Sequence, residues 1–201
     1  MKKALSVFSF VFHPIFFPIL GTLFYCKCAQ NYFVQEYFYL LLFQVVIITF
    51  LLPLTFFYLL KTIGKVDTIR LPEITQRKMS LIVQFVLTLI LIQKGVTIDR
   101  FTELFYFFAS TCIGLLVVFG LLYIKIKASI HLFAMGSFTF FVIGMVIHNQ
   151  MNCLLYLSLL FLITGCIATS RLLLKAPTLQ EIYFGYAIGA LSQVMLFYFW
   201  L

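Results

Sequence analysis

Two short polar stretches carry the side chains of this chain that could do chemistry. They are "KIKASIH", residues 125–131, and "SRLLLKAPTLQE", residues 170–181. Together they supply cations, hydroxyls, one imidazole and one carboxylate: Lys127, Ser129, His131, Ser170, Arg171, Lys175 and Glu181. Arginine binds phosphate oxygens in a bidentate manner, lysine adds a point charge, and serine can donate a hydrogen bond. Histidine can protonate a leaving oxygen or attack phosphorus. These residue types predict a site for a phosphate ester.

The composition predicts that the elements positioning these residues are membrane helices. Of the 201 residues, 64% are hydrophobic and only 10% are charged, whereas soluble domains average about 25% charged residues. A transmembrane helix needs about 20 apolar residues, and their even spread along each run argues against a β-barrel. We therefore expect an all-α polytopic transmembrane bundle, residues 1–201 forming one integral-membrane domain. The expected helices are residues 4–25, 37–60, 79–92, 101–123, 130–147, 154–174 and 182–201.

The third of these runs is the shortest and contains Gln84, so the bundle has six spanning helices if that run does not cross. The first run is followed by no small-x-small cleavage site, and we expect it to be retained. Basic residues mark cytoplasmic loops. With the N-terminus inside, eleven Lys and Arg residues fall on the cytoplasmic side and three on the other. The net charge of +8 follows from this bias, so nucleic acid is not an expected partner.

A family resemblance is carried by the two polar stretches. Ser170-Arg171 is followed by five residues, Pro177, three residues and Glu181, and then by "IYFGYAIGA". This spacing, with Ser129-Ile130-His131 one helix pair upstream, resembles the type 2 phosphatidic acid phosphatase (acid phosphatase/haloperoxidase-like) superfamily, especially its compact bacterial integral-membrane branch. The resemblance covers roughly residues 100–201. It implies a protein of the bacterial inner membrane that handles a lipid or polyprenyl phosphate, with His131 as a candidate general acid.

The chain departs from that family at the position of the nucleophile. The family's last motif has a histidine that forms a phosphohistidine, oriented by the acidic residue four positions later. Here Pro177 occupies the histidine position, and Glu181 occupies the orienting one. The family's first motif, Lys, six residues and Arg-Pro, is absent ahead of Ser129. Bacterial relatives usually open away from the cytoplasm, whereas the charge bias places both stretches inside.

A purely structural interpretation covers most of the same residues. Thr178 and Glu181 have the spacing of a capping box at the start of the last helix. Ser129 suits the N-cap position of the helix that follows it. Arg171 and Lys175 lie one turn apart at a helix C-terminus, where cations complement the dipole and reach lipid headgroups. Only His131 lacks such an interpretation.

Several residues elsewhere have more general expectations. Pro14 and Pro18 are expected to kink the first helix, and Pro53 the second, because each removes a backbone donor. His13, beside the first kink, is either a functional residue or a neutral imidazole donating to a carbonyl freed by the prolines.

Small residues and cysteines complete the expectations. Gly185 and Gly189 have the spacing that lets another helix approach closely. Cys26 and Cys28, with one residue between them and no nearby histidine, make a poor metal site, and we expect neither metal nor cofactor.

Three functional hypotheses follow from these patterns. The favoured one is a phosphatase-like membrane protein that binds an anionic lipid or polyprenyl phosphate and is catalytically impaired by Pro177. A second is an active lipid phosphatase that uses His131 in a non-standard way. A third is a non-catalytic helical subunit that assembles with a protein partner in the membrane. Phosphate binding without turnover favours the first, turnover the second, and neither the third.

Overall fold

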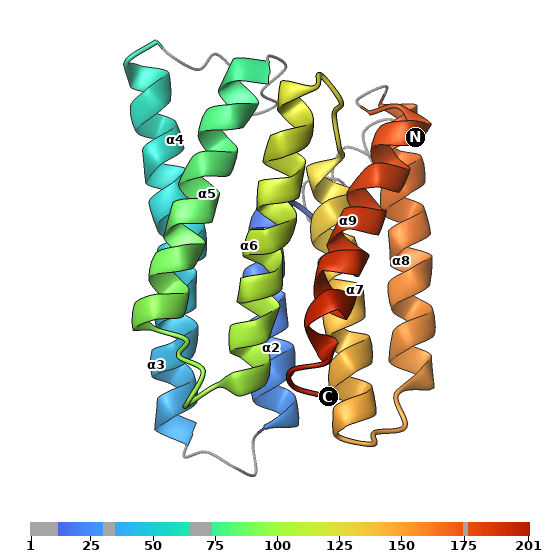
Figure 1. Ribbon diagram of the computed structural model, residues 1–201. Helices are drawn as coiled ribbons and strands as arrows, with labels where there is room; N and C mark the ends of the chain where they lie inside the picture. The colour runs from blue at the N-terminus through green and yellow to red at the C-terminus, as the bar shows by residue number, and fades with distance from the viewer. Residues whose placement is uncertain (1–11, 30–34, 65–73, 175–176) are drawn as a thin grey trace.

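The chain folds into a bundle of long helices that run in alternating directions (Figure 1). The structure is a computed structural model, and it describes residues 12–29, 35–64, 74–174 and 177–201. Within these ranges no strand is present, and the helical elements in chain order are η1 Pro14–Phe16, α2 Phe17–Cys28, α3 Gln35–Val46, η2 Ile47–Leu51, α4 Leu52–Thr62, α5 Ile74–Lys94, α6 Thr102–Tyr123, α7 Ile130–His148, α8 Leu154–Leu173 and α9 Leu179–Phe197. Because α3, η2 and α4 are continuous, the all-α bundle of about seven helices is confirmed.

Four of the helices are long and apolar enough to cross a membrane. They are Glu36–Thr62, Thr102–Tyr123, Ile130–His148 and Leu154–Leu173. The third expected span, which the sequence left open, is the 21-residue helix α5, and it packs against α6. At a rise of about 1.5 Å per residue, α5 is as long as the hydrocarbon core is thick. The chain is therefore an integral membrane protein.

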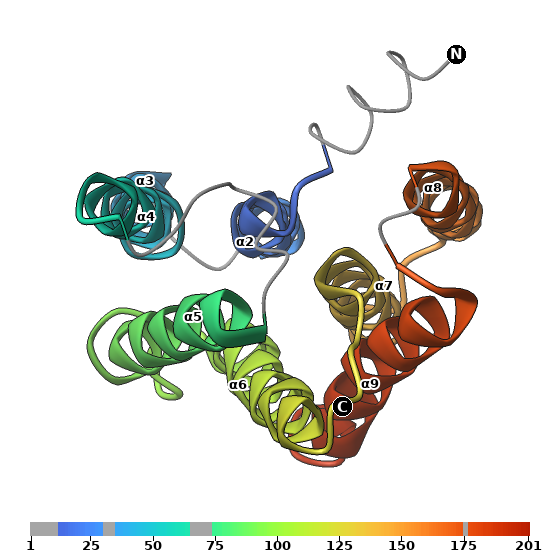
Figure 2. The same ribbon diagram turned by 90° about the horizontal axis from the view of Figure 1, so that it is seen from above.

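The helices form two rows when the bundle is viewed along its axis (Figure 2). One row holds α3 with α4, then α2, α7 and α8, and the other holds α5, α6 and α9. The closest pair is α7 with α9, followed by α6 with α9 and α5 with α6. Helix α7 also packs against α2 and α8, so it is the central element of the bundle. Among the described helices, α7 contributes the largest share of the large, fully buried side chains.

Glycines explain why α7 and α9 approach so closely. A Cβ atom placed on Gly185 would collide with the backbone oxygen of Ser129, and one on Gly189 with that of Phe133. On the facing helix, a Cβ on Gly136 would lie 2.5 Å from the backbone oxygen of Tyr186. The small residues of α9 thus allow a backbone-to-backbone contact with α7, as their spacing in the sequence predicts.

The expected proline kink in the first helix is wrong. Pro14 opens the 3₁₀ turn η1 and Pro18 lies in the first turn of α2, where a missing backbone donor costs no helical hydrogen bond. These prolines therefore start the helix, while residues 4–11 of the expected first span lie outside the described residues. In the second span, the irregularity before Pro53 takes the form of a π-helical turn, Ile47–Leu51, in which Leu52 N donates to Ile47 O.

Candidate functional site

Both polar stretches lie at the same end of the bundle, which we call the inner end (Figure 1). The loop between α6 and α7 carries Lys125, Lys127 and Ser129, and the end of α8 and the start of α9 lie at the same end of the bundle. The opposite, outer end holds the turn between α5 and α6, the turn between α7 and α8, and the C-terminus. The alternation of helix directions thus brings the two stretches to one side, as their spacing in the sequence predicts.

An interior cluster forms around His131, in the first turn of α7. Its imidazole contacts that of His13 edge to face, with ring centroids 5.5 Å apart and an interplanar angle of 79°. Arg171, in the last turn of α8, lies close enough for its guanidinium charge to act on His13. The residue before it, Ser170, is completely buried. We call His13, His131, Ser170 and Arg171 the His–Arg cluster.

The hydrogen bonding of His13 indicates its protonation state. Its Nδ1 accepts a hydrogen bond from Ile15 N at 3.4 Å and so caps the 3₁₀ turn η1. A nitrogen that accepts carries no proton, so the imidazole is neutral with its proton on Nε2 in this arrangement. This bond differs from the one that the sequence suggested, in which His13 donates to a carbonyl freed by the prolines, because here His13 is the acceptor. Instead the bond to Ile15 N fixes the ring at the start of η1, and the protonated Nε2 is a hydrogen-bond donor.

Ser129 occupies the N-cap of α7, as the sequence predicts, but its hydroxyl makes no capping hydrogen bond. Its backbone N–H donates to Glu181 O at 2.8 Å, and its own carbonyl accepts from Phe133 N at 2.9 Å. The first bond joins the start of α7 to the start of α9. Gly185 permits the approach, because a side chain there would meet the Ser129 backbone. Ser129 therefore positions two helices, and Glu181 takes part through its backbone.

Lys127 and Glu181 line an open groove on the outside of the inner end. Its walls come from the α6–α7 loop and the first turns of α9, and they include Lys125, Ile126, Tyr183 and Phe184. His131, Ser170 and Arg171 are not among the residues that line it. The single phosphate pocket expected from the sequence is thus divided between an interior cluster and a surface groove. The sequence could not predict this division, because helices that are apolar all round do not reveal which of their faces points into the bundle.

The start of α9 follows the sequence pattern closely. Thr178 is the N-cap, and its Oγ1 accepts a hydrogen bond from Glu181 N at 3.3 Å. Pro177 stands just before this cap and is half-buried. Lys175, expected to contact phosphate, lies outside the described residues. Nothing in the cap requires a proline, because Pro177 makes none of its hydrogen bonds.

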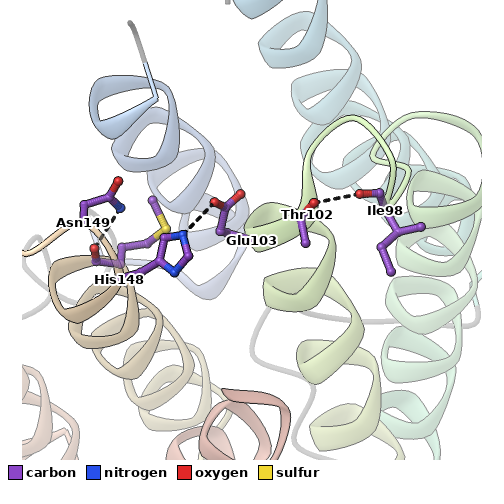
Figure 3. Close-up of polar contacts among 6 residues, drawn as sticks. Ile98, Thr102, Glu103, His148 and Asn149 are labelled. Carbon is purple, nitrogen blue, oxygen red and sulfur yellow. Dashed lines mark hydrogen bonds and ion pairs between the residues drawn. The ribbon is translucent and has the colours of Figure 1, made fainter. Parts of the chain in front are cut away.

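A polar contact at the outer end is not predicted by the sequence patterns. His148 Nε2 lies 3.5 Å from Glu103 Oε1, joining the end of α7 to the start of α6 (Figure 3). In the same view, Asn149 Nδ2 donates to Met145 O at 2.9 Å. An acidic residue at the start of one apolar run and a histidine at the end of the next are the signal that could have found this pair. Both side chains are partly exposed, so the contact is worth less than about 1 kcal/mol.

A second unpredicted feature is a hydrogen-bonded network inside the bundle. Gln193 Nε2 donates to Ser137 Oγ at 2.6 Å and lies 3.2 Å from Phe107 O. Ser137 Oγ lies 3.3 Å from Thr111 Oγ1, which links α6, α7 and α9. Gln193 is 1% exposed, so the amide N–H groups of a side chain in an apolar interior find their acceptors within the protein.

Searches with this chain against protein-family models, curated proteins and solved structures found no match. Among the described residues, no group of three or more His, Cys, Asp or Glu side chains is placed to hold a metal ion. The groups that could do chemistry at this end are therefore the side chains of the His–Arg cluster and the groove.

Proposed function

We propose that this protein binds the phosphate group of an anionic lipid or polyprenyl phosphate at the His–Arg cluster, on the cytoplasmic side of a bacterial inner membrane. The observation that carries the proposal is the juxtaposition of His13, His131 and the charge of Arg171 around the ends of three helices. A planar guanidinium and two imidazole N–H groups are hydrogen-bond donors suited to phosphate oxygens. A phosphate monoester held there would bring negative charge to a region that has excess positive charge.

The charge distribution supports the orientation. The described cations at the inner end are Lys61, Arg77, Lys78, Lys125, Lys127 and Arg171, and those at the outer end are Lys27, Lys94 and Arg100. Under the positive-inside rule this bias puts the inner end in the cytoplasm. The His–Arg cluster then lies at the cytoplasmic end of the bundle.

The resemblance to type 2 phosphatidic acid phosphatases supports a site that binds without ordinary turnover. In that family the histidine at the position of Pro177 attacks phosphorus, and a proline side chain has neither a lone pair nor a proton to offer. Removing a covalent nucleophile typically costs several orders of magnitude in rate. We therefore infer a phosphatase-like binding protein, with Arg171, Ser170 and His131 as its phosphate contacts.

Native mass spectrometry of the detergent-purified protein tests this function. The wild type should retain a lipid phosphate monoester, such as a polyprenyl phosphate, and Arg171→Gln should lose that monoester because the guanidinium is the main cation of the His–Arg cluster. Arg100→Gln is the matched control, since Arg100 is exposed at the outer end. Equal lipid retention by all three proteins would contradict the proposal. Loss of the lipid in both variants would indicate nonspecific charge attraction.

One observation favours the active-enzyme alternative, in which the chain is a lipid phosphatase. His131 has a second imidazole beside it, and the rings are 5.5 Å apart between centroids. A pair of imidazoles can divide the roles of acid and base between them. Turnover of a lipid phosphate at ordinary enzyme rates, abolished by either His13→Ala or His131→Ala, would establish this alternative over binding alone.

A further inference from the structure

The groove at the inner end has two walls of different character. One is the α6–α7 loop, which contributes Lys125, Ile126 and Lys127. The other is the first part of α9, which contributes Glu181, Tyr183 and Phe184. Tyr183 is 71% exposed and Phe184 45%, so the apolar side of the groove opens to the bilayer. Polar groups thus lie at the level of the headgroups and apolar groups beside the acyl chains.

The backbone of Lys125 is held in a conformation that glycine adopts more easily. Its φ is 60°, in the left-handed region, where a Cβ atom is unfavourable. The residue ends α6 in a Schellman arrangement, in which Ile126 N donates to Leu121 O at 3.0 Å. A strained conformation that a different residue would relieve is a reason to look for function in the side chain. Here the side chain is that of a lysine that lines the groove.

The position of the groove is also fixed. Ser129 N donates to Glu181 O at 2.8 Å, and this bond ties the loop that carries the lysines to the helix that carries the aromatic residues. Because Gly185 lets the two backbones meet, the walls cannot separate without breaking the α7–α9 contact. The groove is therefore pre-formed, and a ligand does not have to order it.

We propose that this groove is a binding site for an anionic glycerophospholipid of the surrounding leaflet, distinct from the His–Arg cluster. Lys125 and Lys127 bind the phosphate, and the acyl chains lie along Ile126, Tyr183 and Phe184. Glu181 limits the charge that the groove accepts, because two lysines and one carboxylate leave a net charge of one. The site accordingly favours a phosphodiester with a single negative charge over a phosphate monoester with two.

The test uses full-length protein in detergent with an equal mixture of phosphatidylglycerol and phosphatidylcholine of the same chain length. Native mass spectrometry counts the lipids that stay bound. We expect the wild type to prefer phosphatidylglycerol. This preference should fall about fivefold in each single variant, Lys125→Gln and Lys127→Gln, because one basic residue near a membrane surface contributes about that much. Lys61→Gln removes an exposed charge at the same end outside the groove and should change little. An equal loss in Lys61→Gln would overturn the proposal.

A second pair of variants uses the strained backbone. Gln150 has a φ of 51° at the end of α7, in the same Schellman arrangement but at the outer end. Both Lys125→Gly and Gln150→Gly should raise the unfolding temperature, because glycine relieves the left-handed strain. Only Lys125→Gly should lower phosphatidylglycerol retention. Unchanged retention in Lys125→Gly would show that its side chain does not bind the lipid.

Two more measurements distinguish the groove from the His–Arg cluster and a lipid from free phosphate. Arg171→Gln should keep the phosphatidylglycerol preference, because Arg171 does not line the groove. If Arg171→Gln abolishes the preference while the lysine variants keep it, the groove proposal fails and the interior site stands. Inorganic phosphate in the millimolar range should not displace the lipid. Displacement would show that the acyl chains contribute nothing and would overturn a lipid site.

Discussion

At the inner end of the bundle, the function of each side chain depends on which helix face carries it. His131 contacts His13, on which the charge of Arg171 acts, whereas Lys127 lines the external groove with Glu181. The two stretches of sequence were expected to form one pocket, and the side chains within each stretch separate. His13 and His131 show the opposite behaviour, because they lie far apart in the sequence and are in contact in the structure. Its signal was an ionisable residue in an apolar run, which is a functional candidate by default.

The variant Pro177→His should recover part of the missing chemistry. Pro177 precedes the Thr178 cap, so its replacement breaks no helical hydrogen bond and the protein should fold. The new imidazole can attack phosphorus, but the family's first cationic motif is absent and electrostatic stabilisation is often the largest catalytic contribution. We expect weak but measurable hydrolysis of a soluble phosphate ester, lost again when His131→Ala or Arg171→Gln is added.

Pro177→Ala is the matched control for that experiment, because it removes the proline without supplying an imidazole. It should be folded and inactive. Activity in Pro177→Ala equal to that of Pro177→His would show that the new histidine is not the nucleophile. A well-folded but inactive Pro177→His, in a protein whose wild type binds no phosphate lipid, would favour the helical-subunit hypothesis.

The buried amide of Gln193 makes a separate prediction about stability. Gln193→Leu keeps most of the side-chain volume but removes the hydrogen bonds to Ser137 Oγ and Phe107 O. Interhelical hydrogen bonds in membrane proteins average about 0.6 kcal/mol each, so the free energy of unfolding should fall by about 1 kcal/mol. Unfolding in mixed micelles measures this change. Ser158→Ala, at an exposed hydroxyl bonded within its own helix, should have no effect.

At the scale of elements, the pair α7 and α9 holds the site together. Its contact brings Ser129 against Glu181 and Gly185, and so fixes the loop that carries Lys125 and Lys127. The sequence predicted this pairing through the spacing of Gly185 and Gly189. It could not predict which helix would be the partner, because every apolar helix in the bundle offers a similar face.

Gly189→Leu should separate this pair. A side chain at Gly189 collides with the backbone of Phe133, and backbone atoms cannot move aside as a flexible side chain could. Overpacking typically lowers the free energy of unfolding by about 1–3 kcal/mol, and we expect a loss of about 3 kcal/mol for Gly189→Leu. Gly165→Leu and Gly120→Leu are controls, since a Cβ at either position meets nothing within 4 Å. Equal destabilisation by all three substitutions, measured in mixed micelles, would show that close packing at Gly189 is not the cause.

At the scale of the whole molecule, composition and periodicity were enough to predict an all-α membrane bundle of about seven helices. They also predicted that the two polar stretches share one end, because that follows from helix direction alone. The expected kink at Pro14 and Pro18 was wrong because the start of a helix tolerates proline, and the first described helical turn begins at Pro14. The division of the site, the contact of Glu103 with His148 and the network of Gln193 depend on helix rotation. Uniformly apolar helices carry little information about rotation.

A matched pair of ligands tests whether the inner end of the bundle recognises a phosphate group. Farnesyl phosphate and farnesol share the same apolar chain and differ only in the phosphate. In thermal unfolding of the detergent-purified protein, a phosphate ligand at about one hundred times its Kd should add about 2.7 kcal/mol of stability. We predict that farnesyl phosphate raises the unfolding temperature of the wild type and not that of Arg171→Gln, while farnesol raises neither. Equal shifts with the phosphate and the alcohol, or an undiminished shift in Arg171→Gln, would contradict the claim.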